Sequence, residues 1–195
     1  MKFGSPLKEL GSVDESLLAN AINSVPDAMW RDNQYRQQAF DVHYKTESIV
    51  MMFCNCDAWP KIQVTKESGW DLLHEYAMPL MQEVLKKYYP PGGKVIRAMA
   101  AKLPPASIIK PHVDAHPSFT HAHRIHIPIT SDPKVRFTIG GKPFHLKPQK
   151  VYEINNQLQH SVMNKSKISR ITFIFDYIPP DSLSNIELTS ECSDI

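Results

Sequence analysis

Beyond residue 93 the chain is a series of short runs in which apolar and polar residues alternate, separated by proline and glycine. Eight of these runs have the length of strands: 95–102, 107–114, 124–129, 135–139, 142–146, 151–154, 160–164 and 170–177. A period of two with turn residues between the runs predicts strands rather than helices. Gly140-Gly141 separates two runs by two residues, as in a tight hairpin. Eight short strands at this spacing predict a jelly roll or a small barrel.

Two helical patterns precede the strands. Residues 12–25 begin with Ser12 and Glu15, which have the spacing of a capping box, and an apolar stripe follows as far as Pro26. Residues 67–89 carry a broader apolar face. We therefore expect flanking helices packed on a mainly β domain.

The later strands have two unlike faces. In 124–129, Arg124 and His126 share one face and isoleucines occupy the other, because neighbouring residues of a strand point to opposite sides. In 170–177, Arg170 and Asp176 oppose a face of isoleucine, phenylalanine and tyrosine. An ordinary sheet with one face in water is the simpler reading, but such faces carry lysine, glutamate and threonine rather than histidine and arginine. We interpret the pattern as a lumen lined by polar side chains, with the apolar faces packed against the helices.

His112 and Asp114 lie two residues apart in a segment, 112–126, that holds five of the nine histidines. On a strand this spacing places an imidazole and a carboxylate on the same face. His160 can complete the set from another strand, and two histidines with one carboxylate form the facial triad of non-haem iron(II) oxygenases. The His-x-Asp pattern alone is a weak signal, but Arg170, ten residues after His160, strengthens it.

A buried arginine predicts a carboxylate partner, since breaking a buried ion pair costs roughly 3–5 kcal/mol. For Arg170 the partner is Asp176, Glu153 or the carboxylate of a ligand. A dicarboxylate ligand suits the guanidinium because its fork binds carboxylates with two hydrogen bonds.

At this point the chain resembles a known family. The segments HVD, HRIHIPI, YEINNQLQHSVMN and SRITFIFDY are similar to the aspartyl/asparaginyl β-hydroxylases, a family of Fe(II)- and 2-oxoglutarate-dependent oxygenases. The resemblance covers residues 95–178 and implies a double-stranded β-helix, a jelly roll of the cupin-like kind. It also implies Fe(II), O2 and 2-oxoglutarate as cofactors.

The resemblance carries roles for individual residues. It implies that His112 and His160 bind iron and that Arg170 holds the distal carboxylate of 2-oxoglutarate. Arg124 and His126 occupy the family's Arg-x-His positions, near the other carboxylate. Asp114 is a departure from the best-known animal member, which lacks a carboxylate there. This departure favours a three-ligand site and the microbial branch, which includes hydroxylases of free proline.

We therefore expect residues 1–180 to form one oxygenase domain, with the jelly-roll core at 95–178 and an appended, loosely held acidic tail at 181–195. The predicted reaction hydroxylates a C–H bond of an amino acid, either free or as an Asp/Asn residue in a peptide or protein, and releases succinate and CO2. Two alternatives stay open: a cupin-like metalloenzyme catalysing hydrolysis or isomerisation, and a non-catalytic jelly roll that binds a small molecule.

Charge and composition argue against some classes of binding partner. A net charge of +2, with no long run of lysine or arginine, argues against nucleic acid. The sequence contains no apolar run long enough to span a membrane and no apolar segment typical of a secretory signal. Its three cysteines favour a reducing compartment, so we expect a cytoplasmic monomer or homodimer.

The remaining polar residues near the site have weaker signals. His116, His121 and His123 are expected in a loop at the rim. Asn155 and Asn156 either form a turn or orient metal ligands. The stretch 30–38 is either a lid over the substrate or an exposed loop.

Overall fold

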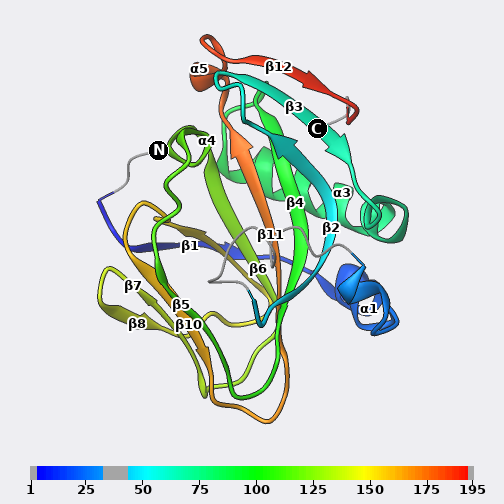
Figure 1. Cartoon of the computed structure of the whole chain (residues 1–195), viewed down its shortest axis with the longest axis vertical. Coiled ribbons are helices and arrows are strands. Elements are labelled where there is room, and N and C mark those ends of the chain that lie inside the picture. Colours follow the sequence, from blue (N-terminus) through cyan, green and yellow to red (C-terminus); the bar gives the residue numbers. More distant parts are fainter. Residues whose placement is uncertain (1–3, 33–43, 193–195) are drawn as a thin grey trace.

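The computed structural model describes residues 4–32 and 44–192. Two β-sheets face one another, as the sequence predicts for a jelly roll, and helices lie along one side (Figure 1). Part of the stretch proposed as a lid falls outside the described residues.

The large sheet has eight strands in the order β1-β9-β6-β11-β4-β2-β3-β12. Its strands are β1 (Leu7–Ser12), β9 (Lys150–Ile154), β6 (His123–Thr130), β11 (Arg170–Ile178), β4 (Lys94–Leu103), β2 (Glu47–Asn55), β3 (Lys61–Lys66) and β12 (Glu187–Ser190). All neighbouring pairs are antiparallel except β3 and β12, which run parallel. The small sheet has the order β5-β10-β7-β8, formed by β5 (Ser107–His112), β10 (His160–Asn164), β7 (Val135–Ile139) and β8 (Lys142–Phe144).

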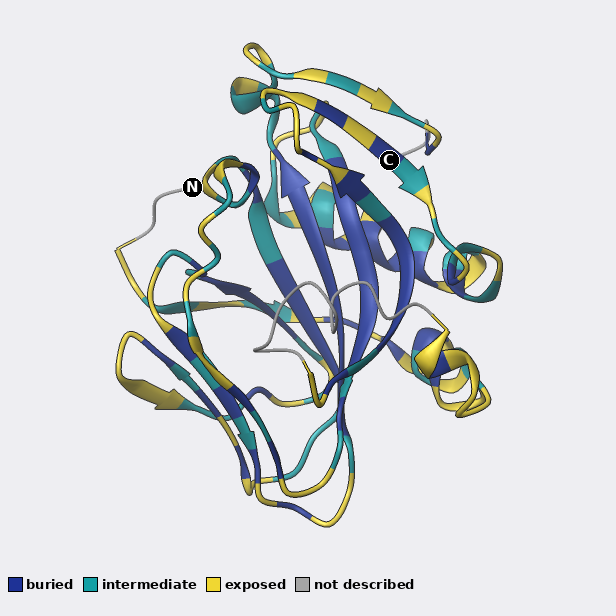
Figure 2. Cartoon of the chain, viewed as in Figure 1, coloured by how far each residue is buried: buried dark blue, intermediate teal, exposed yellow. Residues whose placement is uncertain are grey.

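The two longest helices pack on the outer face of the large sheet. The two longest are α1 (Ser16–Asn23) and α3 (Trp70–Tyr88), and the shorter ones are η1 (Met29–Arg31), α4 (Pro117–His121) and α5 (Pro180–Leu183). Ile125, Ile127, Phe173 and Phe175 belong to one buried cluster with the apolar residues of α1 and α3. The central strands β6, β11, β4 and β2 are accordingly buried through most of their length (Figure 2). The predicted packing of the isoleucine and phenylalanine faces against helices is confirmed.

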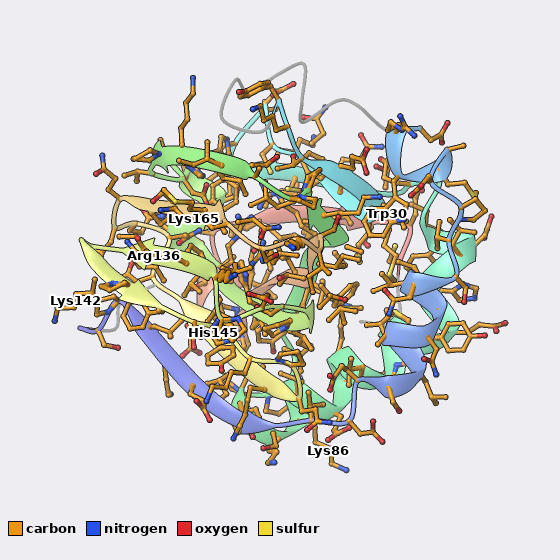
Figure 3. All side chains as sticks on the ribbon, turned by 90° about the horizontal axis from the view of Figure 1, so that it is seen from below. Trp30, Lys86, Arg136, Lys142, His145 and Lys165 are labelled. Carbon is orange, nitrogen blue, oxygen red and sulfur yellow. The ribbon has the colours of Figure 1, made fainter. Side chains whose placement is uncertain are left out.

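A second cluster fills the space between the sheets. It contains Phe137, Ile139, Tyr152 and Val162 among others, contributed by both sheets. On the outer face of the small sheet, Arg136 alternates with the buried Val135 and Phe137 and is exposed (Figure 3). Gly140 and Gly141 have φ angles of +55° and +76°, which a two-residue hairpin requires and which glycine adopts without strain, so the predicted hairpin forms between β7 and β8.

The prediction for the first helix was wrong at its start. Ser12 ends strand β1, where it pairs with Lys150, and α1 begins four residues later. The Glu15 carboxylate accepts a hydrogen bond from the backbone of Gln149 instead of closing a capping box. The sheet partner therefore determines the conformation of Ser12 in place of the local helix signal.

The end of the chain also differs from expectation. Residues 187–190 form β12 at the edge of the large sheet, and Glu187 forms an ion pair with Lys61 at 3.0 Å. The segment is thus tied to β3 rather than loosely held. Among the described residues, no helix combines the length and the apolar character that crossing a bilayer requires.

Candidate metal centre

Three side chains converge at one end of the small sheet. His112, the last residue of β5, stands opposite His160, the first residue of β10, and Asp114 follows two residues after His112. The two imidazole rings are 4.3 Å apart between centroids, and His112 Nε2 lies 3.9 Å from Asp114 Oδ1. One ligand atom from each of the three residues lies within 4.8 Å of the other two. The sequence prediction that these residues meet is therefore confirmed.

Backbone carbonyls orient both imidazoles. His112 Nδ1 lies 2.7 Å from the oxygen of Lys110, and His160 Nδ1 lies 3.0 Å from the oxygen of Leu158. A carbonyl only accepts, so each Nδ1 carries a proton, and in the neutral ring Nε2 is left with a lone pair that can bind a metal. Burial lowers the pKa of His160, against the opposing effect of Asp114, which favours the neutral ring that coordination needs.

The Asp114 carboxylate is held by its neighbours. Its Oδ2 accepts hydrogen bonds from Arg124 Nη1 at 2.9 Å and from Asn156 Nδ2 at 3.1 Å. Burial would raise the pKa of this carboxyl, but Arg124 and the two histidines outweigh it and the pKa lies below its usual value. Asp114 is therefore an anion at neutral pH, as a metal ligand must be.

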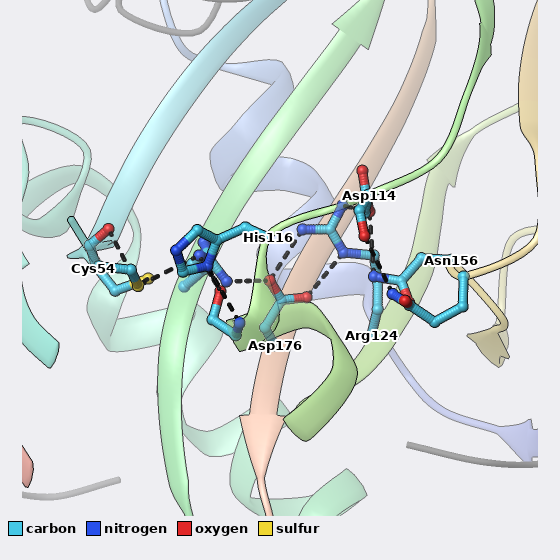
Figure 4. A network of polar contacts seen from close by, with 10 residues as sticks. Cys54, Asp114, His116, Arg124, Asn156 and Asp176 are labelled. Carbon is cyan, nitrogen blue, oxygen red and sulfur yellow. Dashed lines mark hydrogen bonds and ion pairs between the residues drawn. The ribbon is translucent and has the colours of Figure 1, made fainter. Parts of the chain in front are cut away.

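Arg124 lies between two carboxylates (Figure 4). Its Nε and Nη2 donate to the two oxygens of Asp176, both at 2.9 Å, while its Nη1 donates to Asp114. Asp176 is fully buried and also accepts from Arg97 Nη1 at 3.2 Å. Arg97 Nη2 donates to Ser118 Oγ at 2.8 Å. This network of ion pairs and hydrogen bonds extends from the candidate metal site into the large sheet.

Arg170 and His126 lie in the interior around the Phe137 ring. The Arg170 guanidinium carbon is 6.0 Å from the ring centroid of Phe137, and the His126 and His160 ring centroids are 5.8 and 6.1 Å from it. Burial lowers the pKa of Arg170 to about 10. Both ring nitrogens of His126 are buried without a hydrogen-bond partner, and burial, together with the charge of Arg170, holds its pKa well below the usual value. A neutral histidine and a charged arginine therefore share one buried region.

The two acids considered as partners of Arg170 have other partners. Asp176 binds Arg124 and Arg97, and Glu153 accepts from Tyr89 at 3.0 Å while lying 2.6 Å from His123 Nδ1. Over the described ranges, 4–32 and 44–192, Arg170 forms no ion pair with an acidic side chain. The carboxylate of a ligand, the third alternative, stays a prediction.

The other predicted rim residues have distinct positions. His116 caps the short helix α4, its Nδ1 accepting from the backbone of Ser118, and its ring packs against Trp59 together with that of His121. The predicted loop therefore contains a helix. Pro117 at its first position was the available signal.

The two asparagines divide the roles predicted for them. Asn155 shapes the turn, since its side chain accepts from the backbone of Gln157. Asn156 orients Asp114. The Gln157 side chain, which the sequence analysis did not single out, donates to the Asp114 carbonyl at 3.1 Å.

Comparison with known proteins decides the family. A sequence model described as aspartyl/asparaginyl beta-hydroxylase matches residues 20–180. The chain belongs to this family. The predicted resemblance and the enzyme class, an Fe(II)- and 2-oxoglutarate-dependent dioxygenase of the hydroxylase type that uses O2, are thereby confirmed. The match begins at residue 20, well before the segment 95–178 in which the sequence resemblance lies. A search of curated proteins gives no match.

Solved structures share the fold at very low identity. A Trichoplax adhaerens prolyl hydroxylase in complex with a hypoxia-inducible-factor peptide aligns with a TM-score of 0.59 and 9% identity, over 92% of this chain and 86% of its own. A viral collagen prolyl hydroxylase of Paramecium bursaria Chlorella virus-1, in complex with 2-oxoglutarate, gives 0.54 and 7% over 90% and 97%. A 2OG-Fe(II) oxygenase family protein from Burkholderia pseudomallei gives 0.51 and 10% over 85% and 90%. These likenesses confirm the double-stranded β-helix.

Proposed function

We propose that His112, Asp114 and His160 hold Fe(II), that Arg170 holds the far carboxylate of 2-oxoglutarate, and that the enzyme hydroxylates a C–H bond of an amino acid, free or within a peptide or protein. The observation that carries this proposal is the convergence of the three ligands beside a buried arginine that lacks a carboxylate partner among the described residues.

The donor set fits iron of this enzyme class. Two imidazoles and one carboxylate on one side of an ion form the facial triad, which leaves positions for a chelating cosubstrate and for O2. Bound iron supplies the activation of O2, in a reaction that converts R–H, 2-oxoglutarate and O2 into R–OH, succinate and CO2.

The chain's own residues bind and orient. The carbonyls of Lys110 and Leu158 fix the histidine tautomers. Arg170 supplies a positive charge for the distal carboxylate, and the unpartnered nitrogens of His126 suit a position near the other end of the cosubstrate. Direct contact between Arg124 and the cosubstrate was also predicted and stays a prediction. The donors of Arg124 that have partners in the structure are directed to Asp114 and Asp176.

An anaerobic titration tests the proposal. Adding Fe(II) and then 2-oxoglutarate without O2 is expected to give a visible charge-transfer band in the wild type. His112→Ala and His160→Ala are expected to abolish both this band and the release of succinate when O2 is admitted. Full activity in either variant contradicts the ligand assignment. Turnover of another substrate with no need for 2-oxoglutarate would support the cupin-like hydrolase or isomerase.

The substrate is accessible to a direct screen. Succinate release is measured with Fe(II) and O2 across free amino acids, including proline, and short peptides containing aspartate or asparagine. We expect release above the substrate-free background for a member of one of these classes. No substrate-dependent release from any amino acid or peptide contradicts the proposed substrate class.

A further inference from the structure

The two oxygens of the Asp114 carboxylate have different environments. Oδ2 receives hydrogen bonds from Arg124 and Asn156, whereas Oδ1 faces His112 Nε2 at 3.9 Å. The main chain of Asp114 is also fixed, because its N–H donates to the carbonyl of Asn156 at 3.2 Å. The side chain, 10% exposed, therefore presents Oδ1 to the imidazoles while Oδ2 is held by protein donors.

Asp176 determines which donor Arg124 offers to Asp114. Two parallel hydrogen bonds of 2.9 Å join Arg124 Nε and Nη2 to the two oxygens of Asp176. This fork arrangement fixes the plane of the guanidinium, because both partners are planar. Nη1 is then directed to Asp114, at 2.9 Å.

We propose that Asp176 and Arg124 are positioning residues that restrict Asp114 to binding the metal through one oxygen. The inference rests on the proposed ligand set. A carboxylate that binds iron through both oxygens occupies an additional coordination position, which the cosubstrate or O2 requires. Hydrogen bonds to Oδ2 from a charged and a neutral donor hold that oxygen away from this role.

The same geometry shows what the loss of Asp176 does. Without its anchor, the Arg124 fork is free to turn and pair with both oxygens of Asp114, which is the preferred geometry between arginine and a carboxylate. The guanidinium then competes with the metal for Oδ1. Asp176 thus acts on the metal through Arg124 and does not contact it.

The test is cobalt binding by the full chain without 2-oxoglutarate. The variants are Asp176→Asn, which removes the charge, and Arg124→Lys, which keeps the charge but removes the fork. Because loss of such outer partners typically weakens metal affinity about 10- to 100-fold, we expect the Kd for Co(II) to rise by this factor in both. The visible d–d spectrum of bound Co(II) is expected to change, since its oxygen coordination changes.

Glu153→Gln is the matched control. Glu153 is likewise a buried carboxylate of the large sheet, but it contacts His123 and Tyr89 rather than Arg124. We expect its Co(II) affinity and spectrum to equal those of the wild type. A purely structural role of Asp176 would lower the unfolding free energy and leave both cobalt readouts unchanged in the folded protein, which would overturn the inference.

The outcomes separate this inference from the proposed function. If Co(II) binds equally well after His160→Ala, the ligand set itself is refuted. If His160→Ala loses Co(II) while Asp176→Asn and Arg124→Lys keep wild-type affinity and spectrum, only the positioning role is refuted. Should Asp176→Asn fail to fold, Arg124→Lys decides the question by the same two readouts.

Discussion

Replacing Arg170 by methionine is expected to make the metal-free protein more stable while destroying its affinity for 2-oxoglutarate. Arg170 is 5% exposed, and burial lowers its pKa from the ordinary value of a guanidinium to about 10. Since a change of one in pKa corresponds to about 1.4 kcal/mol, holding this guanidinium charged costs about 3 kcal/mol. Arg170→Met removes that cost at similar volume, so we expect the unfolding free energy to rise by about 1–3 kcal/mol.

Although Arg170→Met is expected to stabilise the metal-free protein, it is expected to weaken the binding of 2-oxoglutarate. The variant lacks the charge that meets the distal carboxylate, and breaking a buried pair costs roughly 3–5 kcal/mol, which corresponds to at least about a 100-fold weaker Kd. Urea unfolding of the metal-free protein measures the gain in stability, and urea unfolding of the Mn(II)-loaded protein with and without 2-oxoglutarate measures the loss of binding. At 100 times its Kd, 2-oxoglutarate stabilises the wild type by about 2.7 kcal/mol, and we expect essentially no such gain for Arg170→Met.

Arg97→Met is the matched control for this prediction. Arg97 is also 5% exposed, but it forms an ion pair with the fully buried Asp176. Its removal leaves that carboxylate with one cation fewer, so we expect destabilisation where Arg170→Met stabilises. If both variants lose stability equally, or if 2-oxoglutarate still stabilises Arg170→Met, the assignment of Arg170 to a ligand carboxylate is wrong.

Two further predictions concern pH and the core. Burial holds the pKa of His126 well below 6.5 in the folded chain, so the unfolded chain binds more protons below about pH 6.5. The stability that the neutral ring contributes is fully present above that pH and is lost as the pH falls, by up to about 1.4 kcal/mol per pH unit. His126→Phe is expected to reduce the pH dependence of the unfolding free energy, measured with urea between pH 5 and 7. An unchanged pH dependence would contradict this cause. Phe173→Ala, at a fully buried position on the helix-facing side of β11, is expected to cost about 3–5 kcal/mol of unfolding free energy. Its Co(II) affinity should stay at the wild-type value, and weakened binding in the folded variant would contradict the separation of the two faces.

Alternation along the later strands predicted a jelly roll or a small barrel, and the family resemblance then implied the double-stranded β-helix. The bounds predicted for residues 135–139 and 160–164 are those of β7 and β10. They were accessible because strands with one buried face repeat with a period of two and because Gly140-Gly141 can adopt the positive φ angles of a tight turn. Ser12 shows where local signals fail, since hydrogen bonds to a strand distant in sequence outweighed a capping box of about 1 kcal/mol.

Part of the site was predictable in the same way. The face of a strand follows from sequence, so Arg124, His126 and Asp176 could be assigned to the lumen. The partner of each charged side chain cannot be read from the sequence, because it depends on the register between strands. Asp176, for example, stands opposite Arg124 on β6 and Arg97 on β4. Only the structure shows that Arg124 Nη1 donates to Asp114 and that Asn156 is the second donor to the same carboxylate.

Diffraction from crystals grown with Mn(II) and 2-oxoglutarate under nitrogen tests the central claim most directly. Anomalous scattering is expected to locate one metal ion bound by Nε2 of His112, Nε2 of His160 and Oδ1 of Asp114, with the far carboxylate of 2-oxoglutarate on Arg170. A metal ion elsewhere, or an Arg170 that contacts no carboxylate of the bound cosubstrate, would contradict the account.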